Sequence, residues 1–185
     1  MAKDNVTIYL ILGLLKHESM TGYDIKGRID GSISQFWNVG FSQIYPALKV
    51  MEKEGLVERQ IEGGIKGPDR ILYSITESGN KILMLWLEQP VSKEHLRYEI
   101  MLKLFFGKSV TVEENVARIK EFQGRYAKML DGINMFEDNL KSIIQGTEDD
   151  HLYYYLTVLF GKEVYQAYLK WADKAIELLE QKGNE

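Results

Sequence analysis

Residues 36–56, FWNVGFSQIYPALKVMEKEGL, decide how the rest of the chain is organised. From about Gly40 to Glu54 the sequence predicts a helix with one buried face, because apolar side chains recur at three- and four-residue steps. The buried stripe is Phe41, Ile44, Leu48 and Met51, and the opposite face carries Ser42, Gln43, Tyr45, Lys49 and Lys53. These donors and cations suit a helix that lies in a DNA groove. Taken alone, however, the pattern fits an ordinary surface helix better, so the neighbouring elements must decide.

Two short strands are predicted after this helix, at 56–61 and 71–75, because both are rich in β-branched and aromatic residues. Their connection, EGGIKGPDR at 62–70, is longer than the two to five residues of most hairpin loops. A phosphate-cradling loop is disfavoured, because that motif joins a strand to a helix and ends in Gly-Lys-Ser/Thr. A long hairpin tip with glycines and cations is instead typical of a wing.

The remaining elements of the first half are helices, expected at 5–16, about 22–29 and 77–87. The first is apolar almost all round and must be buried on more than one side. Thr21 and Thr76 are expected to cap the second and the last of these helices. Gly31 to Asn38 would form the turn between the second and third helices, with Phe36 and Trp37 as its apolar plug. The order helix, helix, helix, strand, wing, strand, helix predicts a winged helix-turn-helix in residues 1–90.

Pro90-Val91-Ser92 is expected to separate this domain from a helical domain at 91–185. A short helix should end at Gly107, and two long helices are predicted at 112–145 and 151–181. The first long helix has a heptad-like seam, made of Phe122, Tyr126, Met129, Ile133, Phe136, Leu140 and Ile143. This helical hairpin has more apolar surface than it can bury alone, so we expect a two-fold dimer. The fold class is therefore mainly α with a small β-hairpin: a winged helix-turn-helix followed by a helical dimerisation domain.

The composition indicates a folded protein of 185 residues, with 45% hydrophobic and 27% charged residues. The absence of cysteine and of any apolar run of about 20 residues favours a cytoplasmic location and no membrane span. The net charge of −4 argues mildly against DNA binding, since residues 1–90 carry 10 Lys and Arg against 11 Asp and Glu. A DNA-binding protein with this balance must concentrate its cations on one surface.

No catalytic, cofactor or metal site is predicted. The three histidines, His17, His95 and His151, lie in three different segments, and there is no cysteine and no H-x-x-x-H pair. No set of residues in the sequence therefore supports the hypothesis of an enzyme of unrecognised type.

Three segments of the chain resemble the PadR-family transcriptional regulators: GLLKHESMTGYDIK, FWNVGFSQIYPALKVMEKEGLVE and GPDRILYSITESG. The segment RYEIMLKLFFG at 97–107 resembles the helical C-terminal part of the longer, AphA-like virulence-activator branch of that family. The most specific pieces are IYPALK at 44–49 and GPDRILYSIT at 67–76. One departure is Gly40, where many relatives have a serine as helix cap.

The resemblance implies a homodimer that binds double-stranded DNA through its winged-helix domains. It also implies that the C-terminal helices are swapped between the two subunits. It implies a repressor more often than an activator, and in some members a small-molecule effector, here expected to be hydrophobic. By position, the DNA-binding residues are Ser42, Gln43, Tyr45, Lys49, Lys66 and Arg70. We expect Gln43 and Tyr45 nearest the base edges of a palindromic operator and the other four on phosphates or groove walls.

Other interpretations stay open for these residues. Lys66 and Arg70 could be plainly solvated, and Arg70 could pair locally with Asp69 or Glu62. A winged helix that docks a protein instead of DNA is the main alternative function, and the near-neutral first 90 residues favour it.

Overall fold

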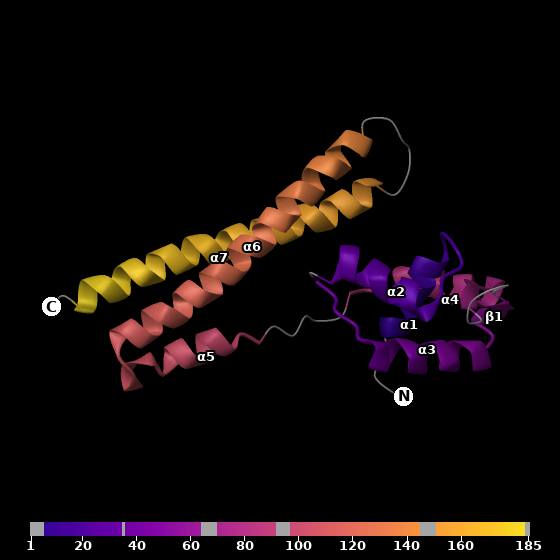
Figure 1. The fold of residues 1–185 in the computed structure, drawn as a ribbon, viewed down its shortest axis with the longest axis horizontal. Helices are drawn as coiled ribbons and strands as arrows, with labels where there is room; N and C mark the ends of the chain where they lie inside the picture. Colours follow the sequence, from indigo (N-terminus) through magenta and orange to yellow (C-terminus); the bar gives the residue numbers. More distant parts are fainter. Residues whose placement is uncertain (1–5, 35, 64–69, 92–96, 145–150, 184–185) are drawn as a thin grey trace. The chain divides into compact units, whose positions relative to one another are not determined.

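The computed structural model describes residues 6–34, 36–63, 70–91, 97–144 and 151–183 (Figure 1). The chain forms two compact units, residues 1–93 and residues 94–185, and each is described by itself. No described helix is long and apolar enough to cross a membrane. Of the residues singled out above, Lys66 and Asp69 of the wing and His95 lie outside the described residues.

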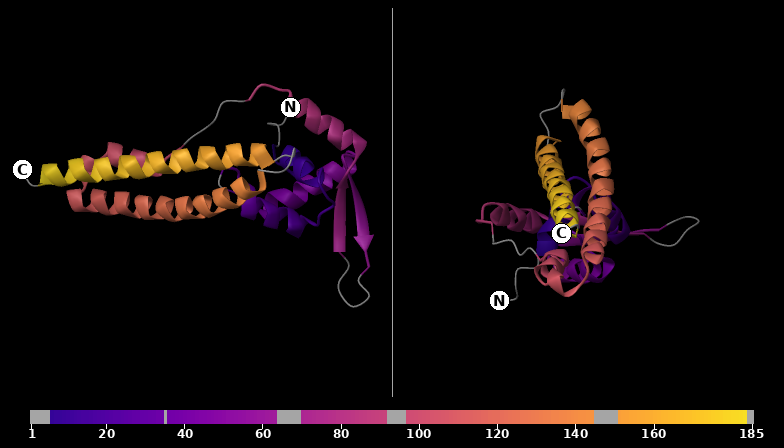
Figure 2. Two further views of the ribbon diagram at one scale, coloured as in Figure 1. Left: turned by 90° about the horizontal axis from the view of Figure 1, so that it is seen from above. Right: turned by 90° about the vertical axis from the view of Figure 1, so that its left-hand side faces the viewer.

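The first unit contains the predicted helices and hairpin in the predicted order. Its elements are α1 (Val6–Leu15), α2 (Gly22–Arg28), the π-helical turn η1 (Ile29–Ile33), α3 (Phe41–Lys53), β1 (Val57–Glu62), β2 (Arg70–Ile75) and α4 (Glu77–Leu87). The strands project from the helices as a ribbon (Figure 2, left). The predicted winged helix-turn-helix is therefore confirmed.

The core of this unit gathers around α1, as its all-round apolar sequence predicts. Ile11 and Leu12 are fully buried, and α1 contacts α2, α3, α4 and β2. Trp86 of α4 stacks on Tyr9, with 4.7 Å between the ring centroids and 5° between the planes. From α3 the core receives Ile44, Ala47, Leu48 and Met51. Because these residues turn one face of α3 toward the core, the side chains on the opposite face of α3 remain exposed.

Both ends of the helix-turn-helix are capped, and Thr21 caps α2 as predicted. The amide of Asp24 donates to the Thr21 hydroxyl (3.1 Å), and the amide of Thr21 donates back to the Asp24 carboxylate (3.0 Å). This reciprocal pair is a capping box at the start of α2. At the end of α3, Gly55 has φ = +70°, and the amide of Leu56 donates to the Met51 carbonyl (2.8 Å). That arrangement is a Schellman motif, which needs a residue that tolerates positive φ.

Thr76 joins the end of α3 to the start of α4. Its hydroxyl donates to the Gly55 carbonyl (2.8 Å) and accepts from the amide of Gly79 (3.0 Å). Its own amide donates to the Leu56 carbonyl (3.1 Å). The predicted helix cap therefore also connects the end of α3 to the start of α4.

The hairpin is antiparallel, with Val57 opposite Ile75 and Glu62 opposite Arg70. A third segment joins it, because Met20 and Tyr73 exchange backbone hydrogen bonds of 3.1 and 2.9 Å. This bridge was not predicted from the sequence. It ties the turn before α2 to the middle of β2 and so fixes the hairpin against the helices.

Two sequence predictions in this unit are wrong. Phe36 and Trp37 do not plug the turn after α2, since both are exposed and Val39 fills the core instead. Phe41 is not part of the buried stripe of α3, since 41% of its side chain is exposed, whereas Ala47 is buried and was not predicted to be. Phe41 is the first residue of α3, and its ring lies between Tyr23 of α2 and Tyr45 and not in the buried core.

The second unit contains α5 (Glu99–Phe105), a short 3₁₀ turn η2 (Gly107–Ser109), α6 (Val112–Ile144) and α7 (His151–Gly183). The two long helices form the predicted antiparallel hairpin and pack along most of their length (Figure 1). Buried residues on α7 recur every seven positions: Val158, Tyr165 and Ala172. The predicted seam on α6 is only partly correct, because Met129 and Ile143 are exposed whereas Glu137 is buried.

Candidate nucleic-acid interface

The outward face of α3 carries the four predicted site residues of this helix. Ser42, Gln43, Tyr45 and Lys49 are all exposed, because the residues between them turn inward to the core. Among the described residues, neither Lys49 nor Lys53 has a carboxylate within ion-pair distance, so their charges are not already neutralised there. The structure thus brings donors and free cations together on one helix, as a groove-binding surface requires.

The first turn of α3 is closed by Gln43. Gly40 has no side chain to cap the helix, and its amide instead donates to the Gln43 side-chain oxygen (3.3 Å). The carbonyl end of Gln43 is therefore engaged, while its amide nitrogen still carries two donors. The Gln43 side chain can therefore still donate hydrogen bonds from the exposed face of α3 while it closes the first turn.

Pro46 lies inside α3 without ending it. A proline has no amide hydrogen, so the carbonyl of Ser42 cannot receive its usual bond from the residue four positions later. The carbonyl of Ser42 therefore lacks one of the regular backbone hydrogen bonds of α3.

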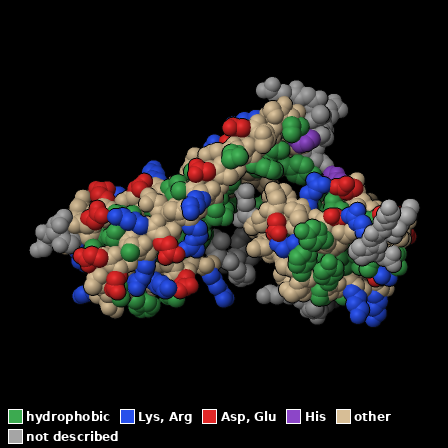
Figure 3. Space-filling model, viewed as in Figure 1, with side chains coloured by type: hydrophobic (Ala, Val, Ile, Leu, Met, Phe, Trp, Pro, Cys, Tyr) green, Lys and Arg blue, Asp and Glu red, His purple; other side chains and the backbone are tan. Residues whose placement is uncertain are grey.

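Three aromatic rings lie in a row beside this polar face. Tyr23 of α2 and Phe41 have ring centroids 6.2 Å apart and 19° between the planes, and Phe41 and Tyr45 have 5.8 Å and 20°. We call Tyr23, Phe41 and Tyr45 the aromatic row. The exposed fractions are 73% for Tyr23, 41% for Phe41 and 50% for Tyr45. Figure 3 shows hydrophobic side chains gathered over α2 and α3 on this face of the first unit.

Neither Tyr23 nor Phe41 was predicted from the sequence to be functional. The three- and four-residue period assigned Phe41 to the core, and nothing in the local sequence distinguished Tyr23 from any other residue at the start of a helix. Tyr23 lies at the start of α2 and Phe41 at the start of α3. This position could have identified them, because residues at the beginning of these two helices lie outside the packed turns.

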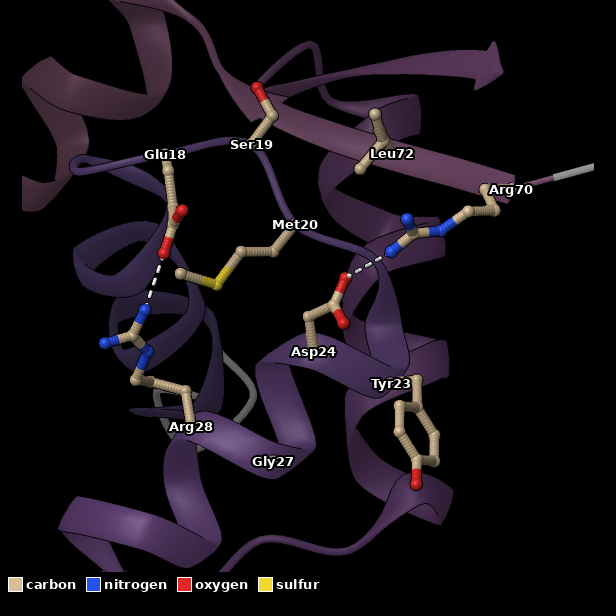
Figure 4. A pocket seen from close by; sticks show the side chains of 9 residues that line it. All are labelled: Glu18, Ser19, Met20, Tyr23, Asp24, Gly27, Arg28, Arg70 and Leu72. Carbon is tan, nitrogen blue, oxygen red and sulfur yellow. Dashed lines mark hydrogen bonds and ion pairs between the residues drawn. The ribbon is translucent and has the colours of Figure 1, made fainter. Parts of the chain in front are cut away.

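Arg70 is at the start of β2 and does not pair with Glu62, although the two are opposite each other in the hairpin. Its guanidinium instead donates to Asp24 of α2, with 3.3 Å between Nη2 and Oδ2 (Figure 4). The hydrogen bond from the Thr21 hydroxyl, followed by that from the Thr21 amide, holds the pKa of Asp24 below its usual value, and Arg70 lowers it further. Arg70 is therefore solvent-exposed but partly neutralised.

A shallow depression of about 520 Å³ lies where α2 meets β2 (Figure 4). Its rim holds two ion pairs, Arg70 with Asp24 and Arg28 with Glu18, the latter at 2.5 Å. Tyr23 is on the same rim, so the aromatic row and the first half of β2 border one surface. The balanced charges give this depression no preference for an anion or a cation.

Within the described ranges, no group of three His, Asp or Glu side chains is arranged to hold a metal ion. The chemistry available on this unit is hydrogen bonding, charge and apolar contact at an exposed helix.

Comparisons with known proteins agree with this geometry. Residues 11–84 match the transcriptional regulator PadR-like family, and residues 96–180 match the virulence activator alpha C-terminal family. The negative transcriptional regulator PadR of Bacillus subtilis is 30% identical over 177 residues, which are 93% of this chain and 96% of that protein.

Solved structures give the same result for the whole fold. Bacillus subtilis PadR in complex with operator DNA superposes with a TM-score of 0.81 at 26% identity, covering 94% of this chain and 99% of that one. The same regulator has been solved with p-coumaric acid, with a TM-score of 0.74 at 25% identity and coverage of 97% and 99%. The Vibrio cholerae virulence activator AphA has a TM-score of 0.75 at 26% identity, with coverage of 95% and 99%. The resemblance identified from the sequence is confirmed.

Proposed function

The chain belongs to the PadR-like family of transcriptional regulators, and we propose that it is a homodimeric repressor that binds a palindromic operator. The observation that carries this proposal is the exposed polar face of α3 in a fold that superposes on a DNA-bound relative. In a two-fold dimer, two such helices would enter successive major grooves about one helical turn, or roughly 34 Å, apart.

Within this proposal, residues 1–90 are the DNA-binding domain and Gln43 and Tyr45 lie nearest the base edges. Ser42 and Lys49 contact phosphates or groove walls, and Lys66 and Arg70 do so from the wing. Support comes from the exposure of the four residues on α3 and from the absence of a described carboxylate partner for Lys49. Arg70 is the weakest member, because Asp24 already neutralises part of its charge.

We assign dimerisation to residues 91–185. Large apolar side chains remain exposed on a single copy of this unit, among them Leu102, Phe105, Leu156 and Phe160. A second copy would remove this surface from water, which is the main driving force for association. Size-exclusion chromatography with light scattering tests this step, and a monomer at micromolar concentration would contradict it.

Control by a small hydrophobic effector is part of the proposal, because Bacillus subtilis PadR has been solved with p-coumaric acid. The proposed function also implies a cytoplasmic protein without catalytic activity. A panel of phenolic acids added to the protein–DNA complex would test the effector, with loss of DNA binding as the expected result.

The experiment that tests the function itself is selection of duplexes from a random pool, followed by fluorescence anisotropy at several salt concentrations. We expect enrichment of a palindromic site and a linear fall of log affinity with log salt. The second candidate, a winged helix that docks a protein, is favoured by the 10 cations against 11 anions of residues 1–90. Failure to bind heparin or any duplex at low salt would favour that alternative.

A further inference from the structure

We propose that Phe41 contacts the 5-methyl group of a thymine in the operator, and that Tyr23 and Tyr45 hold its ring in place for this contact. This inference rests on the proposed DNA-binding function and adds to it a residue that specifies sequence by apolar contact. The residues proposed to act from α3 have so far been polar, whereas the centre of the aromatic row is a phenyl ring.

The position of Phe41 is the first part of the argument. It is the first residue of α3, and in helix-turn-helix proteins the N-terminal residues of the recognition helix contact base edges. Its side chain remains 41% exposed in the free protein, so apolar surface is available for a contact that the fold does not itself satisfy. A phenyl ring can neither donate nor accept a strong hydrogen bond, which leaves apolar groups as its preferred partners on DNA.

The only apolar group that a base presents in the major groove is the thymine methyl. The amino group of cytosine would lose its hydrogen bond to water if it faced the ring, so the contact would also disfavour cytosine. The expected result is a preference for thymine over cytosine at one position of each half-site.

The row fixes the ring before DNA binds. Phe41 lies between Tyr23 and Tyr45, with both neighbouring rings within about 20° of parallel. Tyr45 is itself held against Gly22, since a Cβ built on Gly22 would lie 2.6 Å from Tyr45 Cε1. A ring held in this way loses little side-chain freedom on binding, which strengthens the contact.

The test uses the duplex that the full-length wild-type protein selects from a random pool. Each symmetry-related pair of thymines is replaced by deoxyuridine, which removes only the methyl group. At one pair, we expect the affinity of wild-type protein to fall about fourfold for each methyl contacted, the value for burying one carbon group. Phe41→Ala should bind the thymine and uracil duplexes equally, while its affinity for random duplex stays that of the wild type.

Three further measurements complete the test. Tyr23→Ala changes the row from a different helix and should reduce the uracil penalty without removing any group from α3. Val50→Ala removes exposed apolar surface from a later turn of α3 and should keep the full penalty. Thermal unfolding of each variant reports whether the fold is intact, as expected for a residue outside the buried core.

Several results would overturn the proposal. One is a uracil penalty that is the same in Phe41→Ala and wild-type protein, and another is the absence of a penalty at every thymine of the selected site. Wild-type protein that binds no duplex at all would instead end the proposed function, and with it this inference. These outcomes are distinguishable because random-duplex binding is measured in every case.

Discussion

The ring of Tyr45 lies directly against the backbone of Gly22, so that a methyl group at residue 22 would be 2.6 Å from Cε1 and 3.0 Å from Cζ. Gly22 begins α2 and Tyr45 lies in the second turn of α3, so this contact sets the distance between the two helices of the helix-turn-helix at their exposed edge. The side chain that we expect near the base edges is thus placed by a residue that has no side chain.

Gly22→Ala should therefore separate stability from DNA binding. The added methyl group would push the Tyr45 ring aside, and the exposed ring can move at little cost. We expect the free energy of unfolding to change by less than about 1 kcal/mol, since alanine also favours the helix. Operator binding should weaken by about 1–3 kcal/mol, the range of one lost base contact. Urea unfolding and fluorescence anisotropy measure the two quantities.

The matched control for this prediction is Gly27→Ala in the same helix, where no atom lies within 4 Å of the added group. It should raise stability by about 0.5–1 kcal/mol and leave operator affinity unchanged. Equal operator affinities for the two alanine variants would contradict the role given to Gly22.

Gly79→Ala, unlike Gly22→Ala, should destabilise the fold. Its Cβ would lie 2.1 Å from the Leu56 carbonyl oxygen and 3.0 Å from Leu12 Cδ2, and neither the backbone nor the core can easily move. We expect a loss of at least about 1–3 kcal/mol, as for overpacked cores. Gly13→Ala, with nothing within 4 Å, is the control and should not destabilise. Urea denaturation of both variants provides the measurement.

Lys49→Ala and Arg70→Ala should both weaken binding to every sequence and reduce the salt dependence. For Lys49→Ala we expect the log–log salt slope to fall by about 0.9 for each half-site, the effect of one phosphate contact. Arg70→Ala should change the slope less, because Asp24 already neutralises part of the Arg70 charge. Anisotropy titrations from low to physiological salt would check both values.

A reciprocal variant strengthens this comparison. Asp24→Asn keeps an oxygen that can accept the hydrogen bonds of Thr21 but removes the negative charge beside Arg70. We expect tighter binding to random duplex and a steeper salt slope than in the wild type. Unchanged slopes in both Arg70→Ala and Asp24→Asn would remove Arg70 from the proposed interface.

Glu137 should make the second unit sensitive to acid. The residue is 4% exposed, and its carboxylate pairs with Lys141 and Lys162, each at 2.6 Å. The hydrogen bonds from Lys141 and then Lys162 lower the pKa of Glu137 from 4.5 to about 2. Because the pKa is lower in the folded state, the stabilisation is fully present above pH 4.5 and is lost as the pH falls toward 2.

Glu137→Gln should accordingly lower stability at neutral pH and flatten its pH dependence between about 4.5 and 2. Urea midpoints measured across this range provide the test. The exposed Glu163, which has no ion pair among the described residues, gives a control in Glu163→Gln. A pH profile for Glu137→Gln that is parallel to that of the wild type would contradict the assignment.

The order and approximate bounds of the elements were predictable because periodicity and capping residues are local signals. Thr21, Thr76 and Gly55 each act at the predicted helix end. The bridge between Met20 and Tyr73 was not predictable, since it joins residues far apart in sequence and only backbone atoms take part. The partner of Arg70 was missed for a similar reason, because it comes from α2 and not from the hairpin.

Side-chain burial was less predictable than the elements. Phe41 has the right period for the core but lies at a helix start, where the fold leaves it uncovered. Glu137 shows the reverse case, because a glutamate is normally assigned to the solvent, and its burial here is made possible by Lys141 of α6 and by Lys162 and the Tyr155 hydroxyl of α7. The polar face of α3 was predicted well, because its position follows directly from the buried face opposite.

The three hydrogen bonds of Thr76 have a mechanical consequence. They connect Gly55 and Leu56, which follow the end of α3, to Gly79 in the first turn of α4 through a single residue. A tilt of α4 cannot occur without pulling on the C-terminal end of the helix that we expect to enter the groove. The orientation of α4 is thus tied to the end of α3 by these directed hydrogen bonds, in addition to the packing of both helices on α1.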